Sequence, residues 1–137
     1  MKKLVFLSGF LLMAYLTADA QQVAVASTVS TPARPAAVFA WEQSSHQFGT
    51  IPQGQPVTAT FRFTNTGSVP LVISQVQGSC GCTATDYSKE PIAPGKTGYV
   101  KATYQAATAG PFHKTVTVTA NTGNPVQLTI KGEVKAE

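Results

Sequence analysis

VTATFRFTN, residues 57–65, alternates apolar and polar side chains up to Phe63. Alternation with period two is typical of an antiparallel strand that buries one face and leaves the other in water. The stretch therefore predicts a β-strand with Phe61 and Phe63 in the core, closed by a turn at residues 65–68. The other large apolar residues expected in the same thin core are Trp41, Phe48, Tyr104 and Phe112.

Short segments of the same kind recur on both sides of this strand. The chain holds 11 glycines and 9 prolines, and nearly all fall between these segments. The break in alternation between Ile73 and Val76 indicates a β-bulge. About seven short strands separated by turns predict an all-β fold, an antiparallel immunoglobulin-like β-sandwich. The candidate strands are residues 39–42, 46–48, 57–65, 71–76, 83–87, 99–106, 109–121 and 126–134.

The first 20 residues have the three parts of a secretory signal peptide. Lys2 and Lys3 form a short basic start, and residues 4–16 are an apolar run that is too short to span a bilayer. Ala18-Asp19-Ala20 has the small-x-small pattern of a cleavage site. We therefore expect residues 1–20 to be removed and the protein to be exported, periplasmic or secreted, with no membrane span after cleavage.

The rest of the chain divides into an expected flexible linker, residues 21–37, and one expected domain, residues 38–137. The formal net charge is +4, and the lysines lie singly along the chain. Because a nucleic-acid-binding protein would carry a basic patch, we expect no nucleic-acid partner. Lysines so spaced are interpreted as exposed residues that aid solubility and protect strand edges: Lys89, Lys96, Lys101, Lys114, Lys131 and Lys135.

The chain resembles a family of secreted bacterial proteins known as domain of unknown function 1573 (DUF1573), over about residues 39–134. The resemblance rests on a Phe-Gly-x-Ile start at residues 48–51, Phe63-x-Asn65-x-Gly67, the cysteine stretch at residues 79–83 and Ile92-Ala93-Pro94-Gly95. The family is similar to immunoglobulin-like domains of the ASPM/SPD-2/Hydin type. The resemblance implies an exported immunoglobulin-like domain and carries no established activity, since fold does not imply function.

The chain has two cysteines, Cys80 and Cys82, on either side of Gly81. In an exported protein, nearby thiols tend to be oxidised or bound to metal. One interpretation is structural: a strained local disulfide, for which Gly81 supplies unusual backbone angles, or two half-buried thiols that shape the loop.

Three other interpretations of Cys80 and Cys82 remain open. As thiolates they could bind a soft metal ion such as Cu(I), assisted by His46, His113 and Asp86 only if the fold brings these near. They could exchange disulfides with a partner, since a strained ring is oxidising, although no thioredoxin-like helix is present to lower a thiol pKa. A nucleophilic role is disfavoured, because no positioned base accompanies the pair.

No other set of residues predicts catalysis or a cofactor. Asp86 and Glu90 flank Lys89 in a loop, which is more simply solvated than catalytic, and there is no phosphate-binding or dinucleotide-binding motif. We therefore expect a non-enzymatic module without cofactor or catalytic residue, which binds an unknown protein or cell-envelope partner. The alternative is soft-metal binding or thiol redox chemistry at Cys80 and Cys82. The sequence leaves the oligomeric state open.

Overall fold

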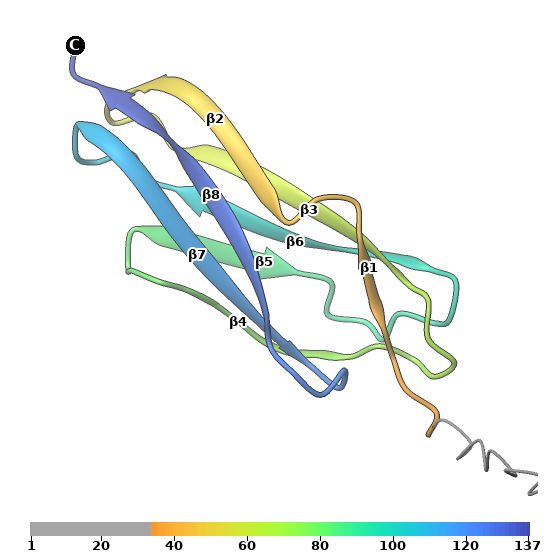
Figure 1. Ribbon diagram of the computed structural model, residues 1–137. Helices are drawn as coiled ribbons and strands as arrows, with labels where there is room; N and C mark the ends of the chain where they lie inside the picture. The colour runs from red at the N-terminus through yellow and green to blue at the C-terminus, as the bar shows by residue number, and fades with distance from the viewer. Residues whose placement is uncertain (1–33) are drawn as a thin grey trace, which may run out of the picture. The chain divides into compact units, whose positions relative to one another are not determined.

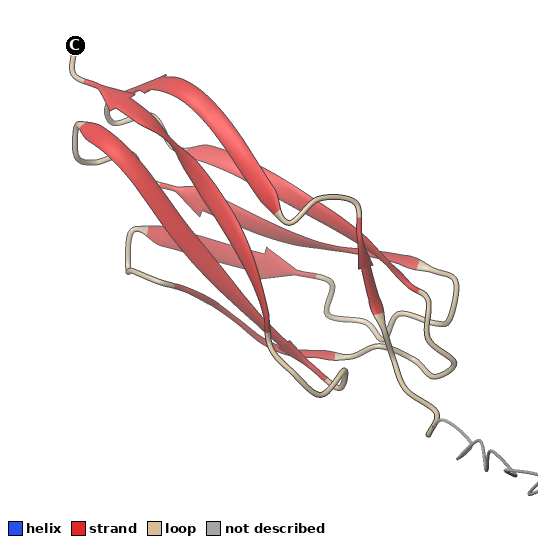
Figure 2. Ribbon diagram, viewed as in Figure 1, coloured by secondary structure: helices blue, strands red, loops and turns tan. Residues whose placement is uncertain are grey.

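The computed structural model describes residues 34–137, which form a β-sandwich of eight strands (Figure 1). Figure 2 shows only strands and loops in this part of the chain, and no helix here is long and apolar enough to cross a membrane. The expected signal peptide and most of the expected linker lie outside the described residues and stay predictions. The strands are β1 (Phe39–Trp41), β2 (Ser45–Pro52), β3 (Val57–Asn65), β4 (Ile73–Gly78), β5 (Thr83–Tyr87), β6 (Thr97–Tyr104), β7 (Gly110–Ala120) and β8 (Val126–Lys135).

The strands form two four-stranded sheets, one in the order β1-β3-β6-β5 and the other in the order β2-β8-β7-β4. This arrangement confirms the all-β sandwich that the sequence predicts. The strand count is eight where about seven were expected, and the two short candidates at residues 39–42 and 46–48 are the separate strands β1 and β2 of different sheets.

One strand pair differs from the expected antiparallel sandwich: β2 runs parallel to β8, with Ser45 opposite Thr129 and Ile51 opposite Val134. The reason lies in the path of the chain (Figure 1). After pairing with β3 in the first sheet, the chain crosses to the second sheet without reversing its direction. It then lies beside β8, which runs the same way. All the other pairs are antiparallel.

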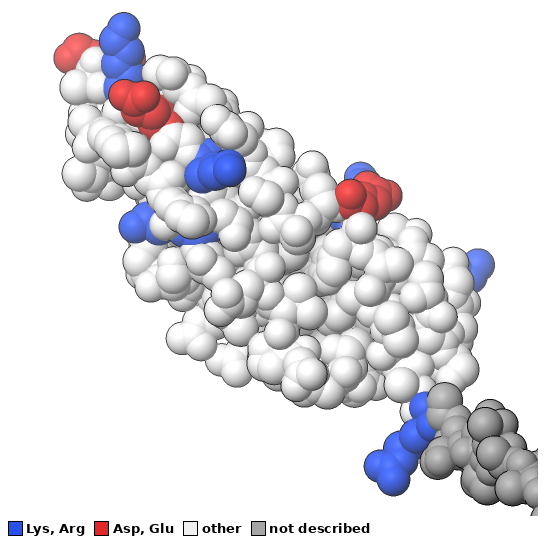
Figure 3. Space-filling view, viewed as in Figure 1, with Lys and Arg blue, Asp and Glu red and all other residues white. Residues whose placement is uncertain are grey.

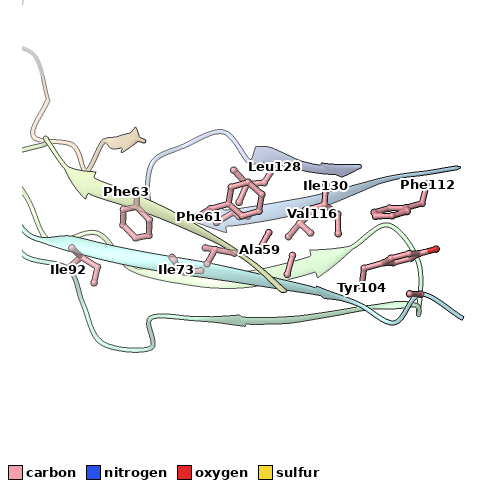
Figure 4. Close-up of a cluster of buried hydrophobic side chains, with 14 of the residues drawn as sticks. Ala59, Phe61, Phe63, Ile73, Ile92, Tyr104, Phe112, Val116, Leu128 and Ile130 are labelled. Atoms are coloured by element: carbon pink, nitrogen blue, oxygen red, sulfur yellow. The ribbon is translucent and has the colours of Figure 1, made fainter. Parts of the chain in front are cut away.

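The core lies between the two sheets and follows the alternation of β3. The side chains of Phe61 and Phe63 are fully buried, as predicted, and Figure 4 shows both rings between the layers. Tyr104 and Phe112 are also buried, whereas Trp41 and Phe48 are only partly buried and pack against the margin of the core. The other fully buried apolar side chains are Ala59, Leu71, Val100, Ala102, Ala106, Val116, Val118, Leu128, Ile130 and Val134.

The bulge predicted near the start of β4 is present. Ile73 lies opposite Ala120 and Gln75 lies opposite Thr119. The chain thus advances two residues on β4 for one residue on β7, which leaves Ser74 as the extra residue of the bulge. Just before the bulge, Leu71 pairs with Ile92, in the connection between β5 and β6, through two backbone hydrogen bonds of 2.8 Å. The bulge thus lies where the chain passes from the core residue Leu71 into the second sheet.

Asn65 does more than begin a turn. Its side chain is fully buried, and its amide nitrogen donates to the carbonyl oxygens of Val69 (2.8 Å) and Ile92 (2.9 Å). Its Oδ1 accepts hydrogen bonds from the backbone N–H groups of Gly67 (3.0 Å) and Val38 (3.3 Å). One side chain therefore joins three separate segments at this end of the sandwich, with all its hydrogen-bonding capacity used.

Ordered packing begins slightly ahead of the expected domain start at residue 38. Ala37 is only 2 % exposed, and the N–H of Ser68 donates to the carbonyl oxygen of Ala36 over 3.0 Å. Gly67 makes this close approach possible, because a Cβ there would lie 2.8 Å from the Cα of Ala37. The segment before β1 is thereby fixed to the loop after β3.

Replacing Gly98 with alanine is expected to lower the free energy of unfolding by about 1–3 kcal/mol, the usual cost of overpacking a core. A Cβ at Gly98 would overlap the ring of Phe63, which is buried and cannot move away. Chemical denaturation measures the loss. The matched control is Gly81→Ala, which meets open space and should change stability by less than about 0.5 kcal/mol. Equal stability of the two variants would contradict the packing described at Gly98.

Candidate functional site

The two cysteines lie in the connection between β4 and β5, and the structure joins them in a disulfide with a Cα–Cα distance of 5.3 Å. The connection is a tight turn in which the N–H of Thr83 donates to the carbonyl oxygen of Cys80 over 3.3 Å. Cys80 and Cys82 are each partly buried, while Gly81 between them is exposed. This is the form that the local-disulfide interpretation assumes.

Gly81 does not play the role expected of it. The glycines with left-handed backbone angles in the described part of the chain are Gly49, Gly54, Gly95, Gly110 and Gly123, and Gly81 is not among them. No atom outside its neighbours lies within 4 Å of where its Cβ would be. The ring between Cys80 and Cys82 therefore closes without a conformation that only glycine adopts.

Hydrogen bonds hold the cysteine turn to both sheets. On the side of the second sheet, the N–H of Ser79 donates to the carbonyl oxygen of Thr115 (2.8 Å), and the N–H of Thr115 donates to the Ser79 hydroxyl (3.1 Å). On the side of the first sheet, the N–H of Gln105 donates to the carbonyl oxygen of Cys82 (3.1 Å). The turn is thus positioned by backbone contacts that do not depend on the disulfide.

A pocket of about 270 Å³ opens beside this turn; we call it the disulfide pocket. Its floor is an aromatic pair, Tyr104 of β6 and Phe112 of β7, whose ring centroids are 4.1 Å apart with an angle of 22° between planes. Figure 4 shows the two rings stacked across the gap between the sheets. The residues that line the pocket are Cys82, Tyr104, Ala107, Thr108, Ala109, Pro111, Phe112 and Lys114.

The rim of the pocket opposite the cysteines is the loop between β6 and β7, and it is firmly fixed. Ala106 is fully buried and has a left-handed backbone (φ 53°), a conformation that costs energy in a non-glycine residue. Its carbonyl oxygen accepts a hydrogen bond from the N–H of Gly54 (2.9 Å), and that of Ala107 accepts one from the Gln53 side chain (2.9 Å). Side chains on this loop therefore have defined positions.

Lys114 is the residue at this site that the sequence analysis misread. It was interpreted as one of the singly exposed lysines, but it is only partly exposed and lines the disulfide pocket. On β7 it shares the inward alternation of Phe112 and Val116, both of which are buried. The sequence did hold a sign of this position: Lys114 alternates with apolar residues of the strand, so its side chain is expected to point toward the space between the sheets.

The residues that were to assist a metal do not gather around the cysteines. His46 lies on β2 opposite Ile130, His113 on β7 opposite Lys131, and Asp86 on β5 opposite Lys101. Within residues 34–137 no three His, Cys, Asp or Glu side chains lie close enough to hold a metal ion together. Metal binding by Cys80 and Cys82 alone would require that their disulfide be reduced to two thiolates. That alternative stays a prediction.

Charged side chains cover little of the face seen in Figure 3. Several of both signs lie together at the end that carries the C-terminus, and a broad uncharged surface separates them from the few others. The face shows no continuous basic stripe of the kind that follows a nucleic-acid backbone.

The sequence matches the family model described as protein of unknown function (DUF1573), over residues 39–134. The chain belongs to the DUF1573 family. The matched range covers all of the strands except the last residue of β8, and it includes the cysteine turn and the disulfide pocket. The search of curated proteins found no match.

Solved structures share the fold of this DUF1573 chain. A protein of unknown function from Porphyromonas gingivalis W83 aligns with TM-score 0.64 and 15 % identity over 72 % of this chain and 47 % of its own, so our chain spans about half its length. The ASH / PapD-like domain 7 of human CEP192 aligns with TM-score 0.63 and 9 % identity, over 76 % of this chain and 89 % of its own.

A third similar structure is the secreted serine protease VesC from Vibrio cholerae, with TM-score 0.53 and 12 % identity, over 74 % of this chain and 23 % of that one. At such identities the likeness shows the fold alone. The PapD-like neighbour confirms the immunoglobulin-like fold expected from the sequence.

Proposed function

We propose that this DUF1573 chain is an exported, non-enzymatic module that binds a protein partner of the cell envelope at the disulfide pocket. The observation that carries the proposal is the pocket itself: an aromatic floor, a rim fixed by backbone hydrogen bonds and one half-buried cation, in a domain otherwise built as a plain sandwich. Export is supported by the signal-peptide pattern of residues 1–20.

The use of buried polar groups supports a binding role over catalysis. The buried polar side chains of the described residues are Asn65 and Thr83. Asn65 holds the loops at the other end of the sandwich, and Thr83 belongs to the cysteine turn. Neither is paired with a base that could activate a nucleophile, which acyl-transfer chemistry requires.

The lining of the pocket indicates the chemistry of its occupant. Stacked Tyr104 and Phe112 offer an apolar surface, and the small side chains of Ala107 and Ala109 leave room above it. Lys114 adds one positive charge at the side. An extended segment of a partner, with one aliphatic or aromatic residue beside a negatively charged group, complements all three features.

Replacing Ala107 with arginine is expected to abolish partner binding without unfolding the domain. The side chain of Ala107 is exposed and lines the pocket, so an arginine there fills the mouth and adds a second positive charge. The measurement is site-specific photo-crosslinking from Thr108 in the native host, with the product identified by mass spectrometry. The product should disappear with Ala107→Arg.

The matched control is Ala40→Arg, since Ala40 is exposed on the outer face of β1 and does not line the pocket. This variant should keep the crosslinked product. If Ala107→Arg and Ala40→Arg gave the same product in the same yield, the disulfide pocket would not be the binding site.

A further inference from the structure

The cysteine turn combines three features that a purely structural staple does not need. Its disulfide is partly exposed, Cys82 lines a pocket, and a lysine from the inward phase of β7 lines the same pocket. We propose that the Cys80–Cys82 disulfide exchanges with a cysteine thiol of the bound partner, and that the sulfur attacked is Sγ of Cys82. This inference rests on the proposed function, because the pocket that binds the partner presents its thiol.

The exchange is balanced by two thiols of the partner. A partner thiolate attacks Sγ of Cys82, the Cys80–Cys82 bond breaks, and Cys80 leaves as a thiolate that takes up a proton from water. A second partner thiol, after losing its proton, attacks the sulfur of the first and releases Cys82 as a thiolate, which also takes up a proton from water. The partner gains a disulfide and is oxidised by two electrons, and this chain gains two thiols.

Position selects Cys82 as the sulfur attacked. Cys82 lines the disulfide pocket, whereas Cys80 does not. Its backbone is fixed to the end of the first sheet by the hydrogen bond from Gln105 (3.1 Å), so the direction of approach is defined. Lys114 lies in the same pocket, and its charge attracts the incoming thiolate.

Thr83 suits Cys80 to be the leaving group. The hydroxyl oxygen of Thr83 lies 3.7 Å from Sγ of Cys80, within hydrogen-bonding reach of a sulfur. Thr83 is buried, so its hydroxyl is held in place and can donate to a thiolate as the charge develops. Exchange is faster when the departing thiolate is stabilised.

The same features answer the objection that no helix is present to activate a thiol. Thiol-exchange proteins with a strand–helix site use the positive end of a helix, and a nearby lysine supplies charge of the same sign. Opening the ring also leaves the fold intact, because Ser79 and Gln105 hold the turn by bonds that do not involve sulfur. A cross-link over so short a loop removes little chain entropy and so contributes little to stability.

The first test maps the attacked sulfur, with reduced glutathione as the probe. The oxidised chain is mixed with glutathione, quenched with acid after short times, alkylated and fragmented in a mass spectrometer. We expect glutathione on Cys82 and the alkyl group on Cys80. Glutathione found mainly on Cys80, or equally on both, would overturn the proposal, as would a reaction slower than that of a linear dipeptide disulfide.

The second test separates the charge of Lys114 from its packing. Lys114→Gln should slow the attack of glutathione roughly threefold at low salt, and the difference should vanish near 1 M salt, where charges are screened over about 3 Å. Lys114→Arg should restore the rate, and the control Lys131→Gln, an exposed residue on β8, should leave it unchanged. A loss that persists at high salt, or one that Lys114→Arg shares, would contradict the electrostatic role.

A third measurement distinguishes failure of exchange from failure of binding. The double variant Cys80→Ser, Cys82→Ser, carrying the photo-crosslinker at Thr108, should still capture the partner. In Cys80→Ser alone, Cys82 is a free thiol. Its thiolate should attack the oxidised partner's disulfide, the reverse of the last exchange step, release one partner thiolate and hold the same partner through Cys82 in a product released by reductant. If the double variant captures the partner and Cys80→Ser forms no reducible product, binding stands and exchange is refuted. If neither captures it, the proposed function fails as well.

Discussion

Replacing Phe61 with alanine is expected to lower the free energy of unfolding by about 3–5 kcal/mol. The ring is fully buried between the two sheets. Its loss removes hydrophobic burial and leaves a cavity, which the sheets on either side cannot close without breaking their own hydrogen bonds. Domains of this kind have only about 5–15 kcal/mol of stability in total, so the variant should be close to unfolding. Urea denaturation of the purified domain measures the change.

The control lies on the same strand. Arg62 follows Phe61 but points to the exposed face, opposite Tyr99 of β6. Arg62→Ala should change the free energy of unfolding by less than about 0.5 kcal/mol. Similar losses for Phe61→Ala and Arg62→Ala would show that the register of β3 is wrong, because a shift of one residue exchanges the two faces.

Replacing Asn65 with aspartate is expected to cost about 3–5 kcal/mol, although the two side chains have the same shape. The amide nitrogen of Asn65 donates to the carbonyl oxygens of Val69 and Ile92. A carboxylate would place an oxygen there instead, so two carbonyls would lose their donor and a negative charge would be buried against them. Thermal and urea unfolding at neutral pH would report the loss.

Asn121 provides a matched control for this substitution. Its amide donates to the carbonyl oxygen of Pro70 (2.9 Å) and its Oδ1 accepts from the N–H of Val72 (2.9 Å), but the side chain is exposed. Water can therefore replace the lost donor, and Asn121→Asp should cost less than about 1 kcal/mol. If Asn65→Asp and Asn121→Asp lowered the free energy of unfolding equally, burial of Asn65 would not be the reason for its large effect.

The sequence alone was enough to predict the two-layered β-sandwich and the face of β3 that points into the core. Alternation identifies which side of a strand is apolar, and this placed Phe61 and Phe63 correctly and located the bulge near Ile73. Alternation does not reveal which strands are neighbours. The parallel pairing of β2 with β8 depends on the path of the chain between the sheets, and no local pattern records that path.

At the candidate site the sequence named the two cysteines but not their surroundings. Tyr104 and Phe112 were expected in the core, yet their stacking at its open end depends on β6 and β7 belonging to different sheets that face each other. Asn65 was taken for a turn residue because asparagine is common in turns, and its full burial is a tertiary effect. Lys114 could have been found from its phase on β7, had each charge been tested against the alternation around it.

The parallel pair at the sheet edge also bears on how the domain responds to mechanical force. β2 comes early in the domain and β8 is its last strand, and the two run in the same direction over six paired positions. Force would therefore act on the first residue of β2 and on the last residue of β8. Tension applied between these two residues would slide these strands past each other, so their hydrogen bonds would be loaded together instead of one after another. Such shear geometry makes the β2–β8 pair a mechanical clamp, and a chain held at one side and pulled at the other would resist extension until that pair gave way.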